Sequence, residues 1–179
     1  MRAAFNDIKD VLEALSYLGV IIGLVFAAFE YNAAKELQNE KNAIEFIRDF
    51  QAEEISEARL WLERQWRPYP LREISGKTGS AEVIDQLAMS FTIESTGGTG
   101  TDNFIRVVDF LDVVGTCVET GICNKTIITR HLGDFTENLL CLYQAPLKVL
   151  RGERGLETLG GKLSFLTDGK VICTGGRAP

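Results

Sequence analysis

The single histidine of the chain, His131, lies three residues before Asp134 and six before Glu137. On a helix, a three-residue spacing brings successive side chains onto adjacent turns, and Asp109 and Asp112 repeat it. Such groups can bind a metal ion or transfer a proton, but one histidine excludes HExxH and other multi-histidine metal sites. We expect solvated helix faces without a metal, cofactor or catalytic residue. The alternative is a membrane-anchored enzyme or signalling effector that uses His131 with nearby carboxylates.

The four cysteines, Cys117, Cys123, Cys141 and Cys173, form neither a CxxC pair nor the dense pattern of a disulfide scaffold. Cys117 and Cys123, followed by His131, lack the spacing of a tetrahedral zinc site. We expect reduced, mostly buried thiols, although an even count also permits two disulfides. Reduced thiols favour a cytoplasmic domain.

Two glycine-rich stretches bear on nucleotide binding. Gly76-Lys77-Thr78 resembles the end of a phosphate-binding loop, but Leu71 stands where the first glycine of that motif is required. Gly97-Gly98-Thr99-Gly100 lacks the GxGxxG spacing and follows a predicted helix instead of a strand. Both stretches are therefore predicted to be loops. The net charge of -6 also argues against a nucleic-acid partner, because no basic stripe is present to contact phosphates.

A local basic and aromatic patch interrupts the acidic chain. In it Arg59, Arg64, Arg67 and Arg72 interleave with Trp61, Trp66 and Tyr69, and the candidate headgroup contacts are Arg64, Trp66, Arg67 and Tyr69. If this segment folds back to a bilayer, it can contact lipid headgroups, and the domain is then a lipid-surface sensor. The interpretation that we favour is a helix end whose tryptophans enter the core.

The N-terminal region carries an apolar stretch, residues 14–29, without a charged side chain. With its flanks the stretch reaches about 20 residues, the length that a membrane-spanning helix requires. Within it Gly19, Gly23 and Ala27 recur every four residues, a small-residue stripe that lets another helix approach closely. We predict a transmembrane anchor that packs against helices of a larger membrane complex or against a second copy of this chain, in contact with membrane lipids.

A buried core helix and a secretory signal peptide are the alternatives for this stretch, since Val25-Phe26-Ala27 resembles a cleavage site. Because the sequence begins at Met1, we expect an uncleaved signal anchor. The basic groups of the flanks are the N-terminal amine, Arg2 and Lys9 before the stretch, and Lys35, Lys41 and Arg48 after it. The positive-inside rule therefore favours neither orientation, and the expectation of reduced thiols favours a cytoplasmic domain.

The rest of the chain predicts a small helical bundle. Residues 30–66 contain neither glycine nor proline, so we expect helix with a break near 49–53. Further helices are expected over 81–93, 102–120 and 124–151. The predicted inward residues include Val83 and Leu87 in the first, Val108, Leu111 and Val114 in the second, and Leu132, Leu139 and Leu147 in the third. Asp102 is the expected N-cap of the second helix, and Pro146 is expected to kink the third.

The C-terminal segment has a different pattern. Residues 162–166 and 171–174 flank Asp168-Gly169, a strong turn signal, and predict a β-hairpin. The fold class is therefore mainly α, with an anchor over residues 1–33, a helical domain over 34–151, and a glycine-rich tail with a hairpin over 152–179. Two strands are marginal alone, so this hairpin needs a covering surface on the domain or on a partner.

Several of these segments resemble a family. They are Glu30-Tyr31-Asn32-Ala33-Ala34-Lys35, Asn103-Phe104, the apolar run to Val118, and Gly121-Ile122. In order and pattern, residues 15–151 resemble a group of uncharacterised bacterial single-pass membrane proteins, classified as a domain of unknown function. The resemblance implies an N-terminal anchor with a helical cytoplasmic domain. The loop at 97–100 and the tail depart from the pattern. We predict a non-catalytic accessory or scaffolding subunit of a membrane complex.

Overall fold

The computed structural model describes residues 2–70, 79–167 and 173, and within them it leaves out the side chains of 2–16, 96 and 153. The chain divides into two compact units, Met1–Gln38 and Asn39–Pro179, which we call unit 1 and unit 2. The second boundary of the sequence prediction, at 151/152, does not appear in this division. The described part of the C-terminal tail belongs to unit 2.

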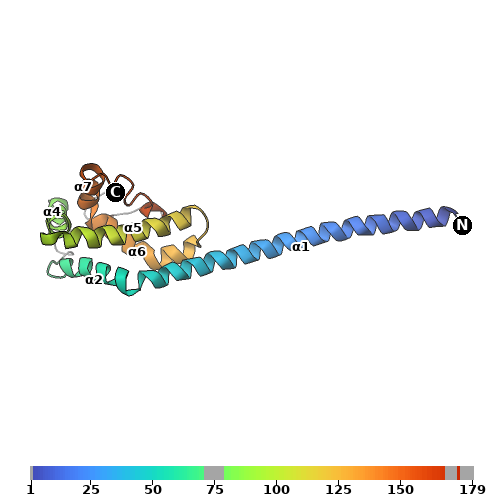
Figure 1. Ribbon diagram of the computed structural model, residues 1–179, viewed down its shortest axis with the longest axis horizontal. Helices are drawn as coiled ribbons and strands as arrows, with labels where there is room; N and C mark the ends of the chain where they lie inside the picture. The colour runs from blue at the N-terminus through green and yellow to red at the C-terminus, as the bar shows by residue number, and fades with distance from the viewer. Residues whose placement is uncertain (1, 71–78, 168–172, 174–179) are drawn as a thin grey trace. The chain divides into compact units, whose positions relative to one another are not determined.

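Unit 1 consists of helix α1 (Arg2–Phe50), whose last residues belong to unit 2 (Figure 1). No proline interrupts α1. Within the described residues it is the one helix long and apolar enough to cross a membrane, with a window of mean hydropathy 1.5 inside Tyr17–Phe50. None of that window is buried. The exposure distinguishes this part of α1 from the core helix considered as an alternative, because core helices are mostly buried.

Apart from an isolated β-bridge at Cys173, the regular structure described in unit 2 is helical, so the mainly α fold is confirmed. Its elements are the end of α1, α2 (Glu53–Trp66), α4 (Ser80–Thr92), α5 (Thr99–Glu119), α6 (Lys125–Leu142), α7 (Gln144–Glu153), and the 3₁₀ turns η1 (Thr96–Gly98) and η2 (Leu163–Phe165). The predicted break near 49–53 is confirmed, since α1 ends at Phe50 and α2 begins at Glu53.

Helix α5 is the centre of unit 2, between α2 and the segment that contains η2 (Figure 1). Its fully buried apolar side chains are Phe104, Val107, Val108, Leu111 and Val114. At Gly115 the backbone of the C-terminal segment replaces a side chain: a Cβ there would lie 2.4 Å from the Lys162 carbonyl oxygen. Any larger residue at position 115 would therefore displace that segment.

Helix α5 begins three residues before the predicted cap, Asp102. Gly98 has a left-handed backbone, with φ 76°, and directs the chain into the helix at Thr99. The Ser95 hydroxyl oxygen accepts a 3.0 Å hydrogen bond from the Gly100 N–H, which satisfies a donor of the first turn. The two glycines thus place the start of the helix before the carboxylate.

The buried face of α4 differs from the prediction. Val83 is 45% exposed and Leu87 is half-buried. The buried residues are Ser80, Ile84, Ala88 and Thr92, at four-residue intervals. The hydroxyl of Thr92 donates a 2.7 Å hydrogen bond to the Ala88 carbonyl, which allows this polar side chain to enter the core.

The predicted helix 124–151 is two helices. The break falls at Tyr143, whose backbone (φ -117°, ψ 26°) is not helical, and Pro146 lies in the first turn of α7. A proline in the first turn removes no helical hydrogen bond, so the predicted kink at Pro146 does not form. The break falls three residues before Pro146, and the Tyr143 side chain at the break is buried.

The predicted C-terminal hairpin is not supported. Residues 163–165 form the 3₁₀ turn η2, and the described residues contain no strand. Leu163 and Leu166 are both fully buried, and a three-residue spacing puts them on one side of a 3₁₀ turn, whereas a strand would direct them to opposite faces. Asp168-Gly169 and residues 170–172 and 174 lie outside the described residues.

Candidate functional site

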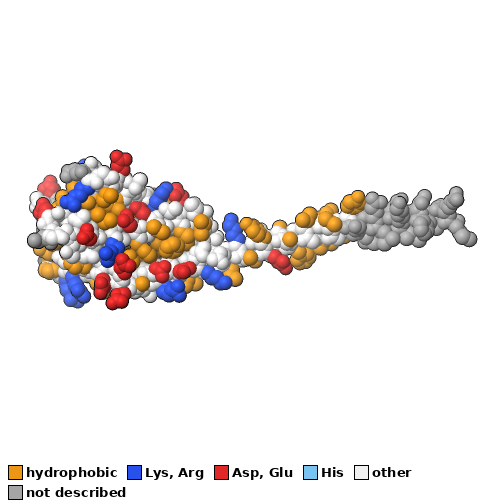
Figure 2. All heavy atoms as spheres, viewed as in Figure 1, with side chains coloured by type: hydrophobic (Ala, Val, Ile, Leu, Met, Phe, Trp, Pro, Cys, Tyr) orange, Lys and Arg blue, Asp and Glu red, His pale blue; other side chains and the backbone are white. Residues whose placement is uncertain are grey.

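The small-residue stripe lies open on the surface of unit 1. A Cβ built on Gly19 or on Gly23 meets no atom within 4 Å, and Ala27 is exposed. The large apolar residues around the stripe are exposed as well: Leu18 56%, Val20 59%, Ile21 61%, Leu24 66%, Phe26 65% and Phe29 69%. Figure 2 shows apolar side chains along this described part of α1. Lipid or protein must cover such a surface, because water disfavours a continuous apolar patch.

The basic and aromatic patch does not form one surface. Trp66 is buried, and its Nε1 donates a 2.7 Å hydrogen bond to the Tyr143 hydroxyl. Arg64 and Arg67 are exposed, while Tyr69 is half-buried and packs on Phe91 at a ring distance of 5.7 Å. The tryptophan therefore belongs to the core, as the favoured interpretation expected, and it is not available to a lipid surface.

The carboxylates on α5 have different surroundings. Asp112 accepts hydrogen bonds from two backbone N–H groups, that of Gly160 and that of Lys162 at 2.8 Å. Asp109 is exposed, and partial burial of its carboxyl together with the charge of Asp112 raises its pKa. Asp112 therefore holds the C-terminal segment on α5, because its two carboxylate oxygens accept from backbone donors of that segment.

The histidine face lies on α6. His131 and Asp134 are exposed, and Glu137 is half-buried. No cluster of three or more histidine, cysteine or acidic residues that could hold a metal occurs among the described residues. His131 and Asp134 of this face are thus open to solvent.

All four cysteines form disulfides, so the prediction of reduced thiols is wrong. Cys117 is joined to Cys123, and Cys141 to Cys173, with Cα–Cα distances of 5.3 and 5.4 Å. Gly121, at φ 69°, turns the chain after α5 and returns Cys123 to the helix end. The second pair spans 32 residues, and no local pattern in the sequence indicates it.

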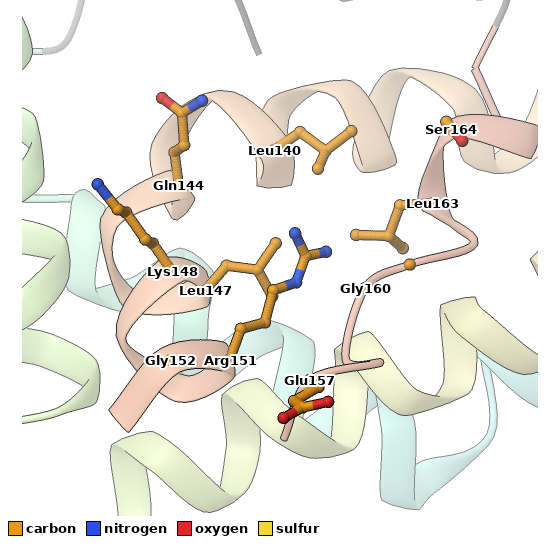
Figure 3. A pocket seen from close by; sticks show the side chains of 11 residues that line it. Leu140, Gln144, Leu147, Lys148, Arg151, Gly152, Glu157, Gly160, Leu163 and Ser164 are labelled. Carbon is orange, nitrogen blue, oxygen red and sulfur yellow. The ribbon is translucent and has the colours of Figure 1, made fainter. Parts of the chain in front are cut away.

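A cavity of about 710 Å³ was missed by the sequence prediction. Leu147, Lys148 and Arg151 of α7 line one wall, and Leu163 faces them (Figure 3). The Arg151 Nε donates a 2.5 Å hydrogen bond to the Leu159 carbonyl, which fixes the guanidinium at this wall. The cavity was not anticipated, because residues 162–166 were predicted to be a strand of a hairpin whose covering surface was left open.

Of the two glycine-rich stretches, the structure describes the one at 97–100. Gly97 and Gly98 have left-handed backbones in the turn before α5, as loop residues do. Gly76-Lys77-Thr78 lies outside the described residues. Comparison with protein-family models, with curated proteins and with solved structures found no match to this chain.

Proposed function

We propose that this chain is a membrane-anchored, non-catalytic interaction subunit, in which the apolar part of α1 crosses the bilayer and packs against another transmembrane helix. The partner is a helix of a larger membrane complex or a second copy of this chain. The observation that carries the proposal is the exposed apolar surface of α1 around a stripe without side chains at Gly19 and Gly23.

The stripe supports a helix–helix contact in a bilayer. Lipid covers large apolar side chains as well as a protein does, so hydrophobicity alone does not bring two such helices together. Small residues at four-residue intervals allow the backbones to approach, and they gain van der Waals contacts that lipid does not supply. Gly19, Gly23 and Ala27 provide this surface, and no described side chain occupies it.

The test is a bulky substitution in the stripe. Gly23→Leu should abolish or strongly weaken co-purification with a partner, or homodimerisation, in mild detergent. Leucine favours a helix more than glycine, so loss of association would not come from loss of the helix. Ala28→Leu is the matched control, because residue 28 lies about 140° from the centre of the stripe at 100° per residue.

The outcome separates the proposal from its alternatives. Both variants should stay in the membrane fraction after carbonate extraction, because each keeps the apolar length. The proposed interface would be contradicted if Gly23→Leu associated as strongly as the Ala28→Leu control and the unsubstituted chain. Recovery of the unsubstituted chain as a soluble protein would contradict the anchor itself. The resemblance to the bacterial single-pass family stays a prediction.

A further inference from the structure

Both disulfides lie in unit 2, and together they use all four cysteines of the chain. We infer that unit 2 faces an oxidising compartment, on the non-cytoplasmic side of the membrane, and that a protein disulfide oxidant forms both bonds there. The inference rests on the proposed function only for the membrane-spanning role of α1.

The first disulfide is built into the turn between α5 and α6. The N–H groups of Ile122 and Cys123 both donate to the Cys117 carbonyl, at 3.0 and 3.1 Å. Asn124 then caps α6, because its side-chain oxygen accepts a hydrogen bond from the Ile127 N–H. The backbone thus holds the two cysteines next to each other through contacts that do not involve sulfur.

The second disulfide joins the C-terminal tail to α6. Cys173 lies 32 residues after Cys141, and its side chain is 7% exposed. Earlier in the tail, Leu163 and Leu166 are fully buried in the core of unit 2. The Cys141–Cys173 disulfide is therefore a second attachment of the tail to unit 2, in addition to the burial of these two leucines.

Burial indicates that the bonds are structural: Cys117, Cys123 and Cys173 are buried, and Cys141 is half-buried. Cys117 is 9% exposed and Cys123 4%. Catalytic or sensing cysteines need access for a reaction partner, and many of them use a CxxC pair, which this sequence lacks. Structural disulfides persist in oxidising compartments, whereas the cytosol keeps such thiols reduced. The arrangement is thus typical of a domain outside the cytoplasm.

Formation of the two disulfides requires an oxidant. For each bond, two cysteine thiols give up two protons and two electrons, and the disulfide of the oxidant protein is reduced to a dithiol. Two such exchanges oxidise the whole chain. The cytoplasmic placement expected from the sequence depended on reduced thiols, and the charge rule does not oppose the new orientation because the basic flanks are tied.

The first part of the test counts thiols in the full chain. Membranes are quenched in acid, denatured and treated with a maleimide of high mass, with and without prior reduction. We expect no addition before reduction and four after it, one per cysteine. Addition of four maleimides without reduction would overturn the inference.

The second part determines the side of the membrane. Glu57→Cys places a new thiol at an exposed position of α2, and Ala3→Cys places one before the apolar stretch. In intact cells, a membrane-impermeant maleimide should label Glu57→Cys, and it should label Ala3→Cys only after permeabilisation. The reverse pattern would overturn the inference even if the disulfides were present.

Carbonate extraction distinguishes the two proposals. A chain that is fully oxidised but soluble, as a cleaved signal peptide would leave it, would contradict the anchor of the proposed function and still support an oxidised unit 2. A chain that is anchored but carries four free thiols would support the anchor and contradict this inference.

Discussion

The indole Nε1 of Trp66, the last residue of α2, donates a 2.7 Å hydrogen bond to the hydroxyl of Tyr143, at the break between α6 and α7. The hydroxyl in turn donates to the Leu62 carbonyl at 3.3 Å. The two rings also meet edge to face, with centroids 5.8 Å apart. Segments 77 residues apart are therefore joined in the core by polar groups that satisfy one another.

Tyr143→Phe should destabilise unit 2. The substitution keeps the ring and removes the acceptor of the Trp66 N–H, which leaves a buried donor unpaired at a cost of about 1–3 kcal/mol. The measurement is the free energy of unfolding from urea denaturation. Tyr69→Phe is the control, since Tyr69 is half-buried, and its effect should stay within about 0.5 kcal/mol. Equal effects of the two variants would contradict the assigned hydrogen bond.

Alkaline pH should weaken the fold through the same residue. Burial, the larger cause, and the charge of Glu63 raise the pKa of Tyr143 far above its ordinary value of 10.0, although the Trp66 hydrogen bond lowers it. The unfolded chain releases this proton near pH 10.0, and the folded chain holds it. The stabilisation is therefore complete below that pH and is lost as pH rises above it.

Urea midpoints measured across this alkaline range should fall more steeply for the unsubstituted chain than for Tyr143→Phe, which has no phenol to ionise at this position. Parallel curves for the two proteins would show that Tyr143 ionises as readily in the folded state as in the unfolded state.

Asp112→Asn should release the C-terminal segment. The carboxylate accepts from the N–H groups of Gly160 and Lys162, and an amide can present only one oxygen to these two donors. We expect a loss of about 1–3 kcal/mol in the free energy of unfolding. Hydrogen exchange at the Gly160 and Lys162 amides should accelerate.

Asp109→Asn is the matched control, three residues earlier on α5. Burial and the charge of Asp112 raise the pKa of Asp109, so the fold disfavours its ionised form. Removing this charge at neutral pH should leave stability unchanged or slightly higher. If Asp109→Asn were as destabilising as Asp112→Asn, the cause would be the loss of a negative charge on α5 and not the loss of the hydrogen bonds to Gly160 and Lys162.

Loss of the second disulfide should cost more than loss of the first. Cys141 and Cys173 are 32 residues apart, while Cys117 and Cys123 are six apart. The chain-entropy relation gives about 3.7 kcal/mol for the longer loop and about 2.2 kcal/mol for the shorter one near 25 °C. Double alanine variants of each pair, compared by urea denaturation, measure the difference. The opposite order would mean that native-state contacts outweigh loop entropy.

Local patterns in the sequence predicted the helices well and the long-range contacts poorly. The absence of glycine and proline from residues 30–66 and the break near 49–53 follow from backbone preferences, which act over a few residues. The pairing of Cys141 with Cys173 depends on how the tail folds back, and no local signal encodes it. The exposed stripe of Gly19 and Gly23 was found because its spacing is itself local.

The hairpin prediction failed where two local signals competed. Asp168-Gly169 favours a tight turn, but Leu163 and Leu166 are spaced for one side of a 3₁₀ turn, and the core of unit 2 buries both. Tertiary packing decided between them. The buried face of α4 was misplaced for a related reason, since Thr92 enters the core only because Ala88 offers its carbonyl.

The contact of Asp112 and Gly115 with residues 160–162 depends on the helical state of α5. The carboxylate and the space for the Lys162 carbonyl share a face only after α5 has become helical, because the two positions are three residues apart. The C-terminal segment therefore has no binding surface on a disordered α5. Docking of this segment and the helical state of α5 are therefore coupled: unwinding α5 near residues 112–115 removes both contacts at once.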